Sequence, residues 1–122
     1  MNGDTAWDRN ESSLRRNMNE LLAGMCFDRE GNPVTDIYTW GTLRDDRAYA
    51  QLCDDDVAGR RVSTVWLGID VGAKIDGRKP RIFETAIFDR DSNVVLLRSY
   101  CTETEARKGH AEALDYVRGL PS

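Results

Sequence analysis

Apolar side chains recur at helical spacing near both ends of the chain and at strand spacing between them. Near the start, the run NESSLRRNMNELLAG (10–24) and the residue after it carry apolar positions at i, i+4, i+7, i+8 and i+11. These positions are Leu14, Met18, Leu21, Leu22 and Met25. The pattern predicts an amphipathic helix that stops at Gly24.

The run CTETEARKGHAEALDYVRGL (101–120) predicts a second, longer helix. Thr102 and Glu105 have the S/T-x-x-E spacing of a capping box, and Gly119 followed by Pro121 ends the pattern. The stripe between them repeats at helical intervals: Ala106, His110, Ala113, Leu114 and Val117. Such a stripe is expected to lie across one face of a sheet.

Three runs between the helices have the composition and alternation of strands: RVSTVWLG (61–68), RIFETAIF (81–88) and VVLLRSYC (94–101). The short connection DRDSN predicts a hairpin between the second and the third. The run TDIYTWGTLRDD (35–46) predicts a short helix capped by Thr35 or Asp36. A further strand is expected over 48–53, ending before three aspartates. These aspartates are candidate cation ligands, although such a like-charge run is more often a solvated loop.

These elements predict an α+β fold: an antiparallel sheet meander with a long C-terminal helix packed on one face and an additional N-terminal helix. Residues 1–122 form a single domain, in which 1–24 are a helical extension and 25–122 the α+β core. Each strand offers apolar side chains to both faces. The second face is therefore expected to be covered by another subunit, which favours a homo-oligomer.

Composition restricts the class of protein. The chain has 40% hydrophobic and 31% charged residues, and its apolar runs are far shorter than the roughly 20 residues that span a bilayer. No membrane partner is expected, and the absence of a signal-peptide pattern at the start favours a cytoplasmic protein. Cys26, Cys53 and Cys101 lack C-x-x-C spacing, so they are interpreted as reduced thiols and not as metal ligands.

Charge is distributed unevenly along the chain. Residues 1–56 carry 6 basic and 12 acidic groups, whereas 57–122 carry 11 basic and 9 acidic groups. A pI near 5.0 disfavours binding to duplex nucleic acid. A small anion held by a few arginines remains open, beside the plainer interpretation of these arginines as solvated surface charge.

Ordinary catalysis is not expected, and neither a metal nor a cofactor is implied. His110 is the only histidine, and its place on an apolar stripe favours a packed, hydrogen-bonded residue over a catalytic base. Asp70 and Asp76 flank the loop between two strands and form a candidate carboxylate pair, although turn-forming aspartates are commoner. The sequence contains no phosphate-binding glycine loop motif and no nucleophile-elbow motif.

The sequence has more residues suited to binding a ligand than to catalysis. Trp66 and Phe83 are candidate faces for stacking a base, and Arg81 and Arg98 are candidate phosphate ligands. Thr102 offers a hydroxyl at a helix N-terminus. Core packing is the favoured alternative for the two aromatic residues, and capping is an equally plain role for Thr102.

Four runs in order, FDREGNPVT, RVSTVWLGID, a proline followed by IFETAIF, and TETEARKGH, resemble a family of small phage-encoded proteins. The match runs from about Phe27 to Val117, and its VSTVWLGxD…IFET core further resembles the type-one Thoeris anti-defence sponges. Two positions depart from the family pattern. Val71 stands where the family has a histidine, and Ser99 separates Arg98 from Tyr100.

This resemblance implies a phage anti-defence protein in the cytoplasm of an infected host. Such a protein sequesters an immune cyclic nucleotide, of the cyclic ADP-ribose type or a cyclic oligonucleotide, without cleaving it. It implies a homo-oligomer such as a hexamer, with Phe83 as the stacking ring, Arg98 as the phosphate ligand and Thr102 as the hydroxyl. The loop 70–79 would be a lid or a subunit contact. The alternative is a protein–protein inhibitor that docks on a host defence complex through its acidic surface.

Overall fold

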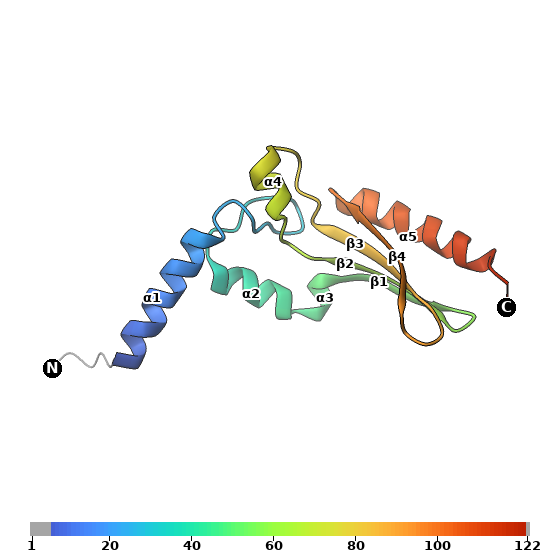
Figure 1. The fold of residues 1–122 in the computed structure, drawn as a ribbon, viewed down its shortest axis with the longest axis horizontal. Coiled ribbons are helices and arrows are strands. Elements are labelled where there is room, and N and C mark those ends of the chain that lie inside the picture. The colour runs from blue at the N-terminus through green and yellow to red at the C-terminus, as the bar shows by residue number, and fades with distance from the viewer. Residues whose placement is uncertain (1–5, 122) are drawn as a thin grey trace.

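A four-stranded antiparallel sheet in the order β1-β2-β3-β4 forms the centre of the fold, and one long helix lies along one of its faces (Figure 1). The computed structural model describes residues 6–121. The helices are α1 (Ala6–Leu21), α2 (Ile37–Asp45), α3 (Arg47–Ala50), α4 (Val71–Asp76) and α5 (Glu103–Arg118). The strands are β1 (Gln51–Val57), β2 (Arg60–Trp66), β3 (Phe83–Phe88) and β4 (Val94–Tyr100). The expected α+β meander is therefore confirmed.

Strand register determines which side chains face α5. Trp66 pairs with Phe83, Thr64 with Thr85 and Val62 with Ile87, and all six are buried. Two apolar clusters form on this face. One contains Ala50, Trp66, Ile82, Phe83 and Ala106, and the other contains Val62, Ile87, Ala113 and Val117.

Helix α5 has the ends and the buried stripe that its sequence predicts. The Thr102 hydroxyl accepts a hydrogen bond from the Glu105 N–H (3.1 Å) and donates one to the Glu105 carboxylate (3.0 Å). Gly119 is the C-cap. The buried residues of the helix are Ala106, Gly109, His110, Ala113 and Val117. The helix is thus held by its cap and by burial of one face.

The segment before the sheet packs around Trp66. Tyr49 meets the Trp66 ring edge-on with centroids 4.9 Å apart, and the Trp40 indole N–H donates to the Gly68 carbonyl (3.0 Å). Arg29 joins this segment to α5, because its Nε lies 3.0 Å from the Glu103 carboxylate and its Nη1 donates to the Tyr49 carbonyl. The N-cap of α2 is Asp36, one of the two expected capping residues.

The expected strand over 48–53 was wrong in its limits. Residues 47–50 form the short helix α3, capped by Asp46, and β1 then runs through the three aspartates instead of ending before them. Pairing with β2 explains the difference, because Asp54, Asp55 and Asp56 each have a register partner there. Tertiary pairing here overrides the low strand propensity of aspartate.

The connection between β2 and β3, which includes the segment 70–79 that was expected as a loop, is partly helical. It contains α4, whose N-cap Asp70 accepts from the Gly72 N–H (2.9 Å) and forms a two-pronged ion pair with Arg78 (2.7 and 3.1 Å). Gly77 ends the helix with φ +68°, a left-handed conformation that suits glycine. These contacts give the connection a fixed internal structure.

Helix α1 projects away from the sheet (Figure 1). It begins before the expected residue 10 and ends at Leu21. Its Arg15 forms an ion pair with Asp36, and its apolar residues Leu14 and Leu21 are exposed. None of the described helices is both long and apolar enough to cross a bilayer.

The face of the sheet opposite α5 carries exposed apolar side chains. Val95 and Leu97 of β4 keep 55% and 54% of their surface exposed. Both point away from α5, because they alternate with Leu96 and Arg98 along the strand. The prediction that a second subunit covers this face remains a prediction.

Candidate functional site

A pocket of about 350 Å³ opens between strand β4 and helix α5. We call it the β4–α5 pocket. It is lined by Thr85, Leu96, Arg98, Tyr100, Gly109, Glu112, Ala113 and Tyr116. Leu96 and Ala113 give it apolar surface, and the buried Thr85 adds a hydroxyl. The other lining residues include a guanidinium, a carboxylate and two phenol rings, a combination typical of small-molecule sites.

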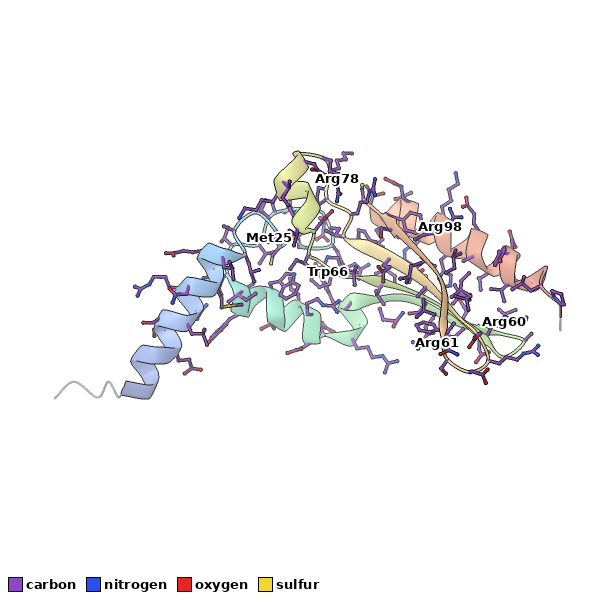
Figure 2. All side chains as sticks on the ribbon, viewed as in Figure 1. Met25, Arg60, Arg61, Trp66, Arg78 and Arg98 are labelled. Atoms are coloured by element: carbon purple, nitrogen blue, oxygen red, sulfur yellow. The ribbon has the colours of Figure 1, made fainter. Side chains whose placement is uncertain are left out.

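Strand register brings the Thr85 hydroxyl and the Arg98 cation together. Arg98 pairs with Thr85 across β3 and β4, so the two side chains are neighbours on the face toward α5. Figure 2 shows Arg98 on β4 beside α5, far from Arg60 and Arg61 at the β1–β2 hairpin. None of the ion pairs formed among the described side chains involves Arg98. Its guanidinium is therefore available to an anion at the pocket.

Tyr100 forms one end of the pocket because α5 has a glycine opposite it. A Cβ built on Gly109 would lie 2.1 Å from the Tyr100 hydroxyl oxygen and 2.2 Å from its Cζ. Only the missing side chain allows the ring to approach the helix this closely. Tyr116, on the same helix, is 56% exposed and presents a second ring at the rim.

A chain of buried hydrogen bonds ends at the floor of this pocket. The Asp55 carboxylate lies 2.7 Å from His110 Nε2, and His110 Nδ1 lies 2.7 Å from the Thr64 hydroxyl. The Thr64 and Thr85 hydroxyl oxygens are 2.6 Å apart. His110, Thr64 and Thr85 are buried. We call these four residues the hydrogen-bond chain.

Two of the expected ligand-binding residues are corrected by the structure. Trp66 and Phe83 are both fully buried in one apolar cluster, so neither ring has a face that a ligand could reach. Their positions on β2 and β3 place them opposite one another beneath Ala106 of α5. The alternative interpretation, core packing, is the one that the structure confirms.

The remaining expected ligands lie in different places. Arg98 lines the β4–α5 pocket, whereas Thr102 caps α5 and is not among the pocket residues. Arg81 precedes β3, and its main-chain N–H donates to Asp70 (2.6 Å) while its side chain is exposed. The structure therefore does not bring Phe83, Arg98 and Thr102 together in one pocket.

The candidate acid–base residues are engaged in structural contacts. His110 is packed and hydrogen-bonded at both ring nitrogens, as its place on the apolar stripe predicts. Asp70 and Asp76 each pair with Arg78 instead of facing one another. Burial raises the pKa of Asp70, but hydrogen bonds from Arg78 and from the Arg81 N–H outweigh it, so the net shift of this pKa is downward.

Sequence reasoning missed Thr85, Tyr100, Gly109, Glu112 and Tyr116 as pocket residues. Strand alternation does place Thr85 with Phe83, and Arg98 with Tyr100, on common faces. Alternation alone does not show that these residues of the two strands lie side by side on the face toward α5, because their placement depends on strand register. Asp55 was missed because the strand was expected to end before it.

Comparison with known proteins assigns no family or function to the chain. No protein-family model, no curated protein and no solved structure matches the chain.

Proposed function

We propose that this chain is a phage anti-defence protein that binds a host cyclic nucleotide signal, of the cyclic ADP-ribose type or a cyclic oligonucleotide, without cleaving it. The site that we assign to it is the β4–α5 pocket. The observation that carries the proposal is Arg98, a guanidinium with no ion-pair partner among the described side chains, which lines one pocket together with Tyr100 and Tyr116.

Each part of this rim suits one part of a nucleotide. A guanidinium binds phosphate oxygens through two parallel N–H donors, and a phenol ring stacks on a base whatever its identity. The pocket volume of about 350 Å³ is near the lower end for ligand sites, which span roughly 300–1,000 Å³. One nucleotide unit therefore fits this pocket better than a whole cyclic oligonucleotide does.

Binding without cleavage is proposed from the resemblance, and the engagement of His110 is compatible with it. A general base needs a nitrogen or oxygen within reach of the proton that it removes. His110 is 4% exposed, and both of its ring nitrogens are already engaged by Asp55 and Thr64. A protein that only sequesters its ligand needs affinity and no such base.

A second copy of the chain is part of the proposal. The apolar face of the sheet that carries Val95 and Leu97 is exposed in the single chain, and apolar patches of this kind favour association. We propose a homo-oligomer in which this face is buried. The β4–α5 pocket lies on the opposite face and remains open in such an assembly.

Ligand retention tests the proposal. The protein is incubated with cyclic ADP-ribose, freed of unbound ligand and heat-denatured, and the released compound is identified by mass spectrometry. We expect unaltered ligand from the unmodified protein. Arg98→Gln should weaken retention by about tenfold or more, because hydrogen bonds to a charged group contribute about 1.5–3 kcal/mol.

Arg90→Gln is the matched control, because Arg90 is an exposed arginine on the β3–β4 hairpin and its Nε donates to the Ala58 carbonyl (3.2 Å) instead of lining the pocket. Release of hydrolysis products would identify an enzyme. Equal retention by Arg98→Gln and Arg90→Gln would reject the β4–α5 pocket as the site, and no retention by the unmodified protein would reject the proposal itself.

The alternative, an inhibitor that docks through the acidic surface, has weaker support. Of the three successive aspartates, Asp54 pairs with Arg61 (2.7 Å) and Asp55 with His110. A hydrogen bond from the Arg61 guanidinium lowers the pKa of Asp54, as expected for a carboxylate paired with a cation. Only Asp56 is left as an exposed carboxylate without a described ion-pair partner. The three aspartates of β1 therefore offer less free negative charge to a partner than their sequence suggests.

A further inference from the structure

The hydrogen-bond chain behind the β4–α5 pocket has a definite direction. We infer that Asp55, His110 and Thr64 hold the Thr85 hydroxyl as a hydrogen-bond acceptor toward the pocket, so that the pocket selects a ligand with a hydroxyl donor next to its anionic group. This inference rests on the proposed function, because it concerns the ligand of the same pocket.

The donor and the acceptor of each hydrogen bond can be assigned by starting from Asp55. A carboxylate only accepts hydrogen bonds, so the His110 nitrogen that lies 2.7 Å from it, Nε2, carries the proton. In the neutral ring the other nitrogen, Nδ1, is then an acceptor. The Thr64 hydroxyl, 2.7 Å from Nδ1, must donate its single proton there.

The assignment at Thr64 also determines which hydroxyl donates in the contact with Thr85. Since the Thr64 proton is used by His110, the Thr64 oxygen can only accept at the 2.6 Å contact with Thr85. Thr85 therefore donates its proton away from the pocket, and its oxygen keeps only lone pairs for a ligand. His110 and Thr64 are positioning residues, and Thr85 is the residue of the chain that lines the pocket.

The pocket then presents opposite hydrogen-bonding groups side by side. Arg98 has only donors, Thr85 has only an acceptor to offer, and the two are register partners on neighbouring strands. A ligand that satisfies both needs an anion next to a hydroxyl. A ribose 2′-hydroxyl beside a 3′-phosphate has this arrangement. A ligand whose oxygen there can only accept would face the Thr85 lone pairs and lose the hydrogen bond.

The direction can be measured without a ligand. We expect the ¹⁵N and ¹H spectra of the unmodified protein at pH 8 to show the proton of His110 on Nε2. A proton on Nδ1 would reverse every step of the chain and overturn the inference. This measurement does not depend on the proposed function or on the stability of a variant.

The consequence for selectivity is tested with two probes, adenosine 3′,5′-cyclic monophosphate and its 2′-O-methyl ether, by titration calorimetry. We expect the unmodified protein to prefer the free hydroxyl by about tenfold, which corresponds to one hydrogen bond. In Thr64→Val the Thr85 proton is free to turn toward the pocket, so this preference should fall several-fold. Thr64→Ser keeps the hydroxyl and should keep the preference.

The outcomes separate the two proposals. An unchanged preference in Thr64→Val, or equal affinities of the unmodified protein for both probes, would overturn the inference while cyclic nucleotide binding stands. If neither probe binds although cyclic ADP-ribose is retained through Arg98, the selectivity inferred here is wrong and the proposed function stands. If no cyclic nucleotide binds at all, both proposals fail.

Discussion

The contact between Gly109 and Tyr100 gives the sharpest prediction about the fold around the pocket. Gly109 lies inside helix α5, where replacing glycine by alanine ordinarily stabilises a helix by about 1 kcal/mol. Here the added Cβ would stand 2.1 Å from the Tyr100 hydroxyl oxygen and 2.7 Å from its Cε1. Because both distances are far below van der Waals contact, the ring must leave its place.

The magnitude follows from two opposed effects. Displacing a packed ring by overfilling costs about 1–3 kcal/mol, against the gain of about 1 kcal/mol in helix propensity. We therefore expect Gly109→Ala to lower the free energy of unfolding by about 1 kcal/mol. For a domain of this length, that is a fall in the melting temperature of about 4 °C in a thermal scan monitored by circular dichroism.

A variant of Tyr100 separates the two effects. In a Tyr100→Val background the side chain is too short to reach the helix, so Gly109→Ala should raise the melting temperature by about 4 °C, the ordinary effect of propensity. A stabilising effect of Gly109→Ala in the presence of Tyr100 would refute the close packing described here. It would also remove Tyr100 as the end of the β4–α5 pocket.

Two further predictions concern ion pairs that hold other segments in place. The Arg29 guanidinium, and then Arg107, lower the pKa of Glu103, so this carboxylate stabilises the fold above its unfolded pKa and loses that contribution as the pH falls through its lower folded value. Glu103→Gln should therefore cost about 1 kcal/mol in urea unfolding at pH 7 and almost nothing near pH 2, and an equal cost at both would contradict this. Asp70→Asn removes the charge that Arg78 binds. The amide of Gly77, which donates to the Ala73 carbonyl at the end of α4, should then exchange its hydrogen about tenfold faster. An unchanged exchange rate would show that the ion pair does not stabilise this helix.

Local signals in the sequence were sufficient for much of the fold. The capping box at Thr102, the spacing of the α5 stripe and the three β-rich runs led to the correct α+β meander, because each depends on residues within a few positions of one another. Asp36 as a cap followed from the same kind of local rule.

Two of the expected ligand-binding residues, Trp66 and Phe83, are buried in the core. An aromatic residue in a strand looks the same in sequence whether it stacks on a ligand or packs in a core. For Trp66 and Phe83 the outcome depended on Ala106 of α5 and Ala50 of α3, which pack against the same cluster from distant parts of the chain. Arg98 lines the β4–α5 pocket, but its role as a phosphate ligand remains a prediction, and its neighbours there were not expected.

The set of elements and the alternation of side chains along each strand can be predicted from the residues alone, because helix caps and hydrophobic periods are local properties. Which alternating sets meet depends on tertiary pairing. Register placed Thr64 beside Thr85 and Thr85 beside Arg98, and packing of α5 then set His110 between Asp55 and Thr64. A shift of one residue in any strand would send these side chains to the opposite face, so the pocket and its hydrogen-bond chain exist only through pairings between segments far apart in the chain.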